Sequence, residues 1–426
     1  MKSRLAIDAV RNAVQAMPDD RLTAARLAAL TQLDQHGLPS TAHEDWKYTD
    51  LGAVIEISNQ WLAAGTDAAA VTDAAVEAIT SQFDADWLII RNGIIDTASI
   101  ADLNRPELAV RLLSDGDLAT AGDTPLSHLN IALLQDGLTI QVAAGYKHDR
   151  TIGILVIDSA ESGIGVSQTR VSIDLQDNGS ASFIEYHAST GAAAHYSNSV
   201  VDMTLADDAT ANYVRIQNRA SAHNQTGHLS ASLSKRSQFH HAAFDFGGEL
   251  VRSDLTIKLN GPESSATICG LYLAGGKQHI DNHTRVDHLV GPAKSQQEYR
   301  GILTDAARCI WNGKAVVHAG ADGTDASQAN HNLLLSEKAE VDAKPELEIY
   351  ADDVKCTHGC TTGQIDPAQL FYLKARGIDH HTAKGLLIHA FATEALEHMT
   401  LAPVKQFCQQ MLTQRMTKSD SLKNLI

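Results

Sequence analysis

Gly179-Ser180-Ala181 opens a short apolar run in the middle of the chain, and similar openings follow at Ala209-Thr210-Ala211, Ser237-Gln238 and Ser265-Ala266-Thr267. They recur at spacings of about 28 to 30 residues, which is within the range for one coil of a solenoid. Each coil of a parallel β-helix buries its inward side chains only against neighbouring coils, so the ends of the stack need covers. The repeat therefore favours a parallel β-solenoid.

The region around these openings, from about residue 130 to 355, consists of short apolar or alternating runs rich in Val, Ile, Thr and Tyr. Gly, Asn, Asp and Ser separate the runs, and no long helical period interrupts them. Such a succession of short strands must form a sandwich, a barrel or a solenoid. Because of the repeat, we predict a mainly β chain built on a parallel β-helix.

Helical patterns flank the strand region on both sides. Apolar residues recur at helical spacing up to His36 with a break at Pro18, and two short strands are expected around Asn92-Gly93. After Gly363, Asp366-Pro367 can start a helix. We predict an N-terminal mixed domain over residues 1–127, a β-helix core over 128–362 and a C-terminal helical docking domain over 363–426. The two helical parts are expected to cover the ends of the stack.

Composition excludes several classes of protein. The 426 residues include 34 Lys and Arg against 51 Asp and Glu, and the net charge of −17 would repel a nucleic-acid backbone. The hydrophobic fraction of 44% is too high for a disordered chain. The start of the sequence holds no apolar stretch that suits a signal peptide, and no run suits a membrane helix. We expect a cytoplasmic protein that binds neither nucleic acid nor membrane.

The strongest candidate for chemistry is Asp353-Val354-Lys355-Cys356-Thr357-His358-Gly359-Cys360. On a strand, Cys356 and His358 point to the same face, where a thiolate and an imidazole can ligate zinc, copper(I) or an iron–sulfur cluster. Gly359 could let the backbone bring Cys360 near the same point. No second Cys/His pair occurs at matching spacing, so the site is incomplete on one chain. Two hypotheses remain open: buried thiols without function, or half a site that a partner chain completes.

The other three cysteines, Cys269, Cys309 and Cys408, lie among apolar residues and are expected to be free thiols packed in the core. The five cysteines together are an odd number, which argues against a disulfide framework.

Two further patterns are weaker. His279, Asp281 and His283 share a strand face and could form a two-His, one-carboxylate metal site, but a satisfied polar face of the solenoid is the favoured interpretation. The adjacent pair His240-His241 is weaker still. Gly275-Gly276-Lys277 lacks the remainder of a P-loop, and no nucleophile elbow, HExxH helix or Rossmann fingerprint occurs. We therefore expect no self-contained enzyme.

Several segments resemble the SufD members of the SufB/SufD family, which are subunits of the SUF iron–sulfur cluster assembly complex. The similarity covers most of the chain, and its most specific segments are His43-Glu44-Asp45-Trp46-Lys47-Tyr48-Thr49, His279-Ile280-Asp281 with Thr284, Asn332-Leu333-Leu334-Leu335-Ser336, residues 339–350, residues 353–359 and residues 371–378.

The resemblance implies a right-handed parallel β-helix flanked by helical domains. It implies a heterodimer with SufB through the β-helix, and the SufC ATPase bound through the C-terminal helices. The Cys/His pair of the family falls on Cys356 and His358, which would ligate a transient iron–sulfur cluster shared with SufB. The protein would then be a non-catalytic scaffold component. A flavin in the complex and a homodimer of the isolated chain stay open.

This chain differs from the family pattern at two positions. Ala339 stands where SufB carries its cluster-building Cys, which implies an accessory subunit rather than the main scaffold. Cys360 stands where Ala or Asn is more usual, so an additional metal ligand or merely a small residue is implied there. Two other functions are weighed against this one: a purely structural partner with inert Cys356 and His358, and a carbohydrate-active β-helix enzyme.

Overall fold

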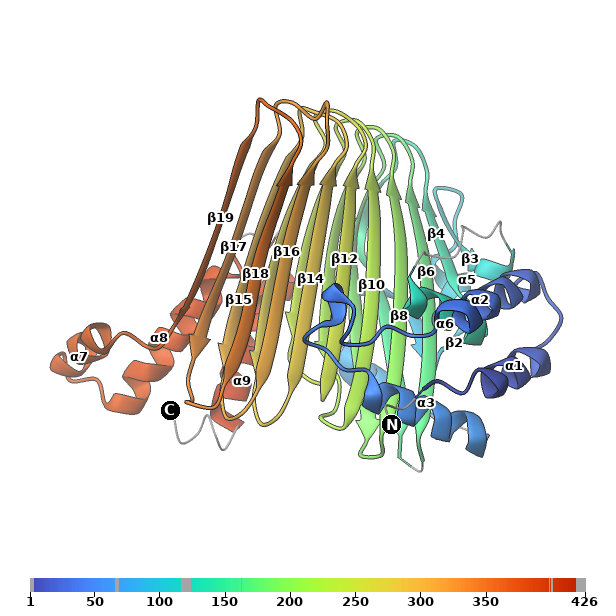
Figure 1. Ribbon diagram of the computed structural model, residues 1–426, viewed down its shortest axis with the longest axis horizontal. Coiled ribbons are helices and arrows are strands. Elements are labelled where there is room, and N and C mark those ends of the chain that lie inside the picture. The colour runs from blue at the N-terminus through green and yellow to red at the C-terminus, as the bar shows by residue number, and fades with distance from the viewer. Residues whose placement is uncertain are drawn as a thin grey trace.

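The computed structural model describes residues 4–65, 69–115, 124–161, 163–397, 399 and 401–418, with side chains up to residue 414. Its centre is a two-sheet solenoid of parallel strands, with helices from both ends of the chain packed against it (Figure 1). The predicted mainly β class and parallel solenoid are confirmed. Within the described ranges, no helix is long and apolar enough to span a membrane.

From residue 138 on, successive strands alternate between the two sheets, so each strand pairs with strands two positions away in sequence. The short strands before residue 138 extend the two sheets at the N-terminal end. The first sheet, sheet A, contains β1 (Ala85–Arg91), β2 (Ile94–Ile95), β5 (Lys147–Ala160), β7 (Ser180–Gly191), β9 (Thr210–Asn218), β11 (Gln238–Asp245), β13 (Ser265–Ala274), β15 (Lys294–Leu303), β17 (Asp325–Leu334) and β19 (Lys355–Gly363). Sheet B contains β3 (Leu108–Leu112), β4 (Leu138–Val142), β6 (Gly165–Leu175), β8 (His195–Leu205), β10 (His223–Leu233), β12 (Leu250–Leu259), β14 (His279–His288), β16 (Arg308–Val317) and β18 (Glu340–Ile349).

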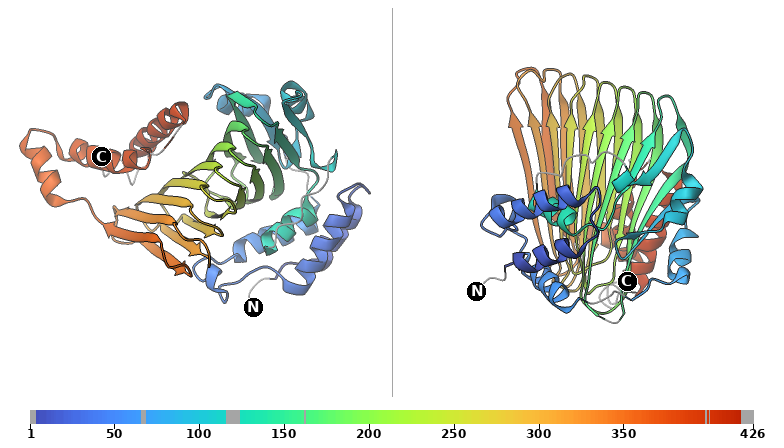
Figure 2. Two further views of the ribbon diagram at one scale, coloured as in Figure 1. Left: turned by 90° about the horizontal axis from the view of Figure 1, so that it is seen from above. Right: turned by 90° about the vertical axis from the view of Figure 1, so that its right-hand side faces the viewer.

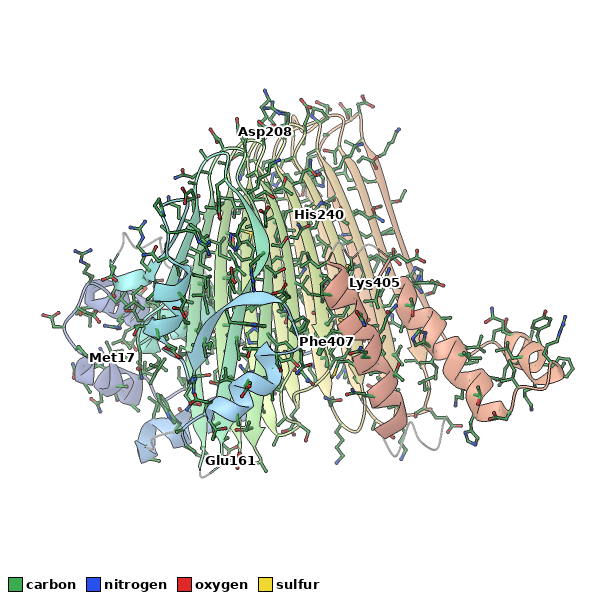
Figure 3. All side chains as sticks on the ribbon, turned by 180° about the vertical axis from the view of Figure 1, so that it is seen from behind. Met17, Glu161, Asp208, His240, Lys405 and Phe407 are labelled. Atoms are coloured by element: carbon green, nitrogen blue, oxygen red, sulfur yellow. The ribbon has the colours of Figure 1, made fainter. Side chains whose placement is uncertain are left out.

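The predicted openings are the starts of stacked strands in sheet A. Ser180 pairs with Thr210, Thr210 with Gln238, and Gln238 with Ser265, so the sequence repeat is one coil long. Just before these strands, Asn178, Asp208 and Arg236 adopt positive φ angles of 58°, 61° and 57°. Their N–H groups donate to the next coil's turn, as Asp208 does to the carbonyl of Lys235 at 2.9 Å (Figure 3). Each of these turn residues is followed by a small residue, namely Gly179, Ala209 or Ser237, whose side chain needs little space inside the turn.

Alternate residues of every coil form the core between the sheets. On sheet A, Phe183, Tyr213 and Ile268 occupy one row of this inner core, while on sheet B Val201 and Leu229 face them. The intervening residues point outward, where the flanking helices cover part of each sheet. Each coil therefore needs its neighbours to bury its inner row.

The helices within residues 7–64 and the helix of residues 125–133 cover the outer face of sheet B (Figure 2). The helix of residues 73–80 and the C-terminal helices pack on the outer face of sheet A. The helices are α1 (Ile7–Ala16), α2 (Thr23–His36), the single-turn η1 (Glu44–Trp46), α3 (Gly52–Ala64), α4 (Asp73–Thr80), α5 (Thr97–Leu103), the single-turn η2 (Leu113–Asp115), α6 (Pro125–Leu133), α7 (Pro367–Ala375), α8 (His380–Glu394) and α9 (Ala402–Lys418). Three local predictions are confirmed: the helices on either side of Pro18, the strand pair around Asn92-Gly93 and the helix start at Asp366-Pro367.

The prediction that C-terminal helices cover the end of the stack is wrong. Helices α8 and α9 lie along the outer face of sheet A, where the Phe407 ring stands 4.8 Å from the ring of Phe83 (Figure 3). An apolar stripe is buried more completely on a broad sheet face than across the rim of one coil. Strands β18 and β19 consequently stay at an open end of the solenoid.

We predict that Gly270→Ala destabilises the protein. A Cβ at Gly270 would stand 2.1 Å from the ring of Tyr299, which the next coil places on the same inner row and buries completely. The expected loss is about 1–3 kcal/mol of the free energy of unfolding, measured by urea denaturation. Gly227→Ala is the matched control, since its nearest neighbour would be 3.9 Å away. Equal unfolding midpoints for both variants would contradict this packing argument.

A candidate metal-ligand site at the open end of the solenoid

Cys356, His358 and Cys360 lie on β19, the last strand of sheet A. Their register partners on β17 are Ala326, Gln328 and Asn330, all buried. The row of His358 continues through Gln328 and Gln297 to Ile268 of the inner core. All three side chains therefore point toward the space between the sheets, and Cys356 shares a face with His358 as the alternation predicts.

These inward-facing side chains are accessible because no further coil follows β19 among the residues that the structure describes. Cys356 is half-buried, and His358 and Cys360 are exposed. Across the opening, β18 ends sheet B with half-buried residues over most of its length. The three side chains thus line the rim of the solenoid interior, where a second molecule could reach them.

The spacing along β19 limits which residues can share one metal ion. At a rise of roughly 3.3 Å per residue, the Cα atoms of Cys356 and His358 are about 6.6 Å apart, while Cys356 and Cys360 are about 13 Å apart. Gly359 pairs regularly with Ala329, so the backbone does not bend toward a common point. Cys356 and His358 can ligate one ion or cluster together. Cys360 can reach a centre near His358, but not one ion together with Cys356.

The two thiols at the open end are not activated within this chain. Burial raises the pKa of both Cys356 and Cys360, and the charge of Asp325 raises that of Cys356 further. Thiolates are the form that binds metals, so binding here must displace protons. No cluster of three or more His, Cys, Asp or Glu residues in the described part of the chain could hold a metal ion. A metal ion bound by Cys356 and His358 would therefore need further ligands from outside the described residues.

The remaining cysteines occupy the core, as predicted. Cys269 and Cys408 lie in the apolar cluster between sheet A and its helices, and Cys309 lies in the inner core. Burial raises the pKa of Cys269 to about 12 and places the pKa values of Cys309 and Cys408 well above the ordinary range. All five cysteines are free.

The face formed by His279, Asp281 and His283 is an internal polar network rather than a metal site. Asp281 accepts hydrogen bonds from Thr49 at 2.5 Å and from Arg252 at 2.6 Å, and His283 Nε2 is 3.1 Å from its other oxygen. Although burial opposes it, the guanidinium of Arg252 holds the pKa of Asp281 well below its usual value. The Arg252 guanidinium already pairs with Asp281, which favours a polar face of the solenoid over a metal site.

The sequence alone did not predict that this polar network binds residues 43–49 to the outer face of sheet B. Residues 43–49 cross the outer face of sheet B and form a strap: Trp46 stacks against Arg252 of β12 at 4.3 Å, and Thr49 contacts Asp281 of β14. The strap reaches β18, where Glu44 pairs with Lys344 at 2.9 Å. One feature of the sequence could have indicated this contact. Residues 43–49 and His279-Ile280-Asp281 are both among the segments that carry the family resemblance.

Another missed feature is a polar section of the solenoid interior. Glu185 lies 3.0 Å from His187, and His187, Arg215 and His241 line the same cavity of ≈ 30 Å³. This volume admits one or two water molecules. Burial lowers the pKa of His241 to about 3, so this histidine is neutral, whereas its neighbour His240 points outward (Figure 3). The lining residues of this cavity reach as far as Tyr299 of β15, and none of them lies on β17 or β19.

Comparison with known proteins places these features in a family. Residues 156–391 match the model of the "SUF system FeS cluster assembly, SufBD core domain". The chain is 29% identical to the iron–sulfur cluster assembly protein SufD of Escherichia coli over 391 residues, which is 91% of each chain. It is 26% identical to an iron–sulfur cluster assembly SufBD family protein of Synechocystis, covering 94% of this chain and 93% of that one. The identity to SufD of Bacillus subtilis is 26%, over 66% and 64% of the two chains.

We predict that alkylation distinguishes two classes of thiol in the folded chain. Iodoacetamide should label Cys356 and Cys360 and should reach Cys269, Cys309 and Cys408 only after unfolding, as peptide mass spectrometry can establish. Because burial raises the pKa of both accessible thiols, their labelling rates should still increase at pH values near 9, the ordinary value. A rate that levels off below pH 8 would contradict the raised pKa values.

Proposed function

This chain belongs to the SufBD core family of the SUF system for iron–sulfur cluster assembly, and on that premise we propose that it is the accessory, SufD-type scaffold subunit of a SUF complex. In this proposal it pairs with SufB at the open end of the solenoid, presents Cys356 and His358 to the nascent cluster, and binds the SufC ATPase through its C-terminal helices. The observation that carries the proposal is the inward-facing Cys/His pair on the uncovered final strand.

The open end of the solenoid supports pairing with a homologous subunit. Both β18 and β19 have one edge without a strand partner in the described part of the chain, and soluble proteins usually protect such edges. A partner with the same coil geometry can extend both sheets and cover the inner row at once. Ile349 and Tyr350, 43% and 63% exposed at the end of β18, add apolar surface to this end. The same surface could support a homodimer of the isolated chain.

The ligand geometry supports transient binding of the cluster as cargo. This chain offers a thiol whose pKa is raised and an exposed imidazole, so the remaining ligands must come from the partner. Separation of the two subunits would then remove part of the coordination set, and reprotonation of Cys356 would disfavour rebinding. Ala339, which provides no thiol, keeps this chain in the accessory role.

The C-terminal helices support docking of the ATPase. Helix α7 extends away from the stack, and its Phe371 and Tyr372 are 73% and 58% exposed (Figure 1). Large aromatic side chains of this kind are typical anchors of protein interfaces. Asp366 caps the start of α7 by accepting from the N–H of Ala368, so the exposed segment is a formed helix.

The finer parts of the architecture also belong to this proposal. We propose right-handed coils, the usual hand of a connection between parallel strands of one sheet. We keep the predicted domains of residues 1–127, 128–362 and 363–426 as part of this proposal, although the first boundary falls within α6 and the second within β19. We propose a cytoplasmic location and assign no residues to a flavin. Family membership favours a scaffold over a carbohydrate-active enzyme.

We predict that His358→Ala and Cys356→Ser each reduce cluster accumulation at least about tenfold, because each removes one ligand of an incomplete set. The measurement is absorption spectroscopy after anaerobic incubation of the co-purified complex with Fe²⁺ and sulfide. Thr357→Ala, on the outer face of the same strand, is the matched control. Normal accumulation in both ligand variants, with the complex still assembled, would favour the purely structural partner.

We predict that the double variant Phe371→Ala/Tyr372→Ala loses SufC during co-purification and retains SufB, because the two aromatic rings are the exposed anchors of α7. Ile94→Ala is the control, since Ile94 is also an exposed apolar residue (55%) but lies on β2. Retention of SufC by the double variant would contradict docking through α7.

A further inference from the structure

A row of three polar side chains leads from the solenoid interior to the open end. Gln297 of β15 pairs in register with Gln328 of β17, and Gln328 pairs with His358 of β19. In parallel strands, side chains in register lie about 4.8 Å apart on the same face, and stacked Gln amides can then form ladders of hydrogen bonds. His358 is the accessible end of this row.

The two glutamines are buried, and their amides are incompletely paired. Gln297 and Gln328 are 1% and 3% exposed. Gln297 Oε1 accepts a hydrogen bond from Thr284 of the opposite sheet at 2.5 Å. Within the described residues, both Oε1 and Nε2 of Gln328 lack a hydrogen-bond partner. A buried unpaired amide group costs about 1–3 kcal/mol, which favours any rotation that pairs it.

The register identifies the groups that can pair with Gln328. On one side lies Gln297, whose Oε1 has a second lone pair besides the one that Thr284 uses. On the other side lies the His358 ring. If Gln328 Nε2 donates to Gln297 Oε1, then Gln328 Oε1 is oriented toward β19 and can accept only from a donor there. The imidazole N–H of His358 is such a donor.

We propose that Gln328 is the positioning residue for His358. Its Oε1 accepts from one ring N–H, which fixes the tautomer and leaves the lone pair of the other ring nitrogen directed at the open end. A ligating histidine commonly donates its second N–H to an oxygen in this way, and loss of such a partner typically weakens metal binding 10–100-fold. The metal-binding part of this inference rests on the proposed function, whereas the hydrogen bond does not.

The first test reads the hydrogen bond directly. Histidine ¹⁵N NMR of the full chain, with the His358 signals assigned by their loss in His358→Ala, should show one dominant tautomer. Gln328→Leu should give a mixture of tautomers, because leucine has a similar size but no acceptor. Gln328→Glu keeps an oxygen acceptor at this position, so it should keep the wild-type tautomer. An unchanged tautomer in Gln328→Leu overturns the inference.

The second test reads cluster accumulation on the complex co-purified with SufB and SufC and incubated with Fe²⁺ and sulfide. Gln328→Leu should reduce accumulation about 10–100-fold. The matched control is Gln168→Leu, which also removes a buried amide without partners in the described residues, but on β6, far from the open end. It should keep normal accumulation and the wild-type tautomer. Thermal unfolding of each variant verifies that the chain is folded.

The outcomes separate the inference from the proposed function. An altered tautomer in Gln328→Leu together with normal accumulation in His358→Ala would support positioning and contradict the ligand role. The opposite result is a loss of accumulation in His358→Ala, with normal accumulation and an unchanged tautomer in Gln328→Leu. It would support the ligand role of His358 and contradict positioning by Gln328. Equal losses in Gln328→Leu and Gln168→Leu would overturn the inference, since they would indicate a general cost of removing buried amides.

Discussion

Each coil of this protein buries its inner side chains only against the coils on either side, and the other features of the structure depend on that constraint. It requires inner rows that fit closely, as where the ring of Tyr299 occupies the space left by Gly270. It also leaves the last coil uncovered by any other part of the chain that the structure describes. A solenoid therefore ends in a surface whose side chains resemble those of its interior, and in this chain that surface carries Cys356, His358 and Cys360.

Charged groups inside the structure follow a different rule, because each needs a partner of opposite charge at close range. Arg219 and Asp158 are fully buried and 2.5 Å apart, and Arg215 and Asp245 are 3.0 Å apart. Such pairs are costly to separate, so they hold the coils that they join in one register. The open end has no comparable pair among its three inward side chains. This difference separates the fixed interior from a rim that can accept a partner.

The sequence predicted the elements that depend on local pattern. Coil length, the free cysteines and the shared face of Cys356 and His358 all follow from spacing or from residue type. It did not predict contacts between distant segments: Thr49 and Asp281 are 232 residues apart, and no local pattern indicates their hydrogen bond. The position of α8 and α9 was also mistaken, because an amphipathic stripe indicates burial but not the surface that provides it. Glycine permits a bend, yet Gly359 continues a regular strand.

The strap that joins Glu44 to Lys344 affects the order in which the chain can become structured during synthesis. Most contacts of the solenoid join residues about 30 positions apart, so coils can stack as the ribosome delivers them. The contact between Glu44 and Lys344 spans 300 residues and must wait until β18 has emerged. Residues 43–49 are synthesised early, but their contact with β18 can form only late. When this contact is present, the strand β18 must already be in its place in sheet B.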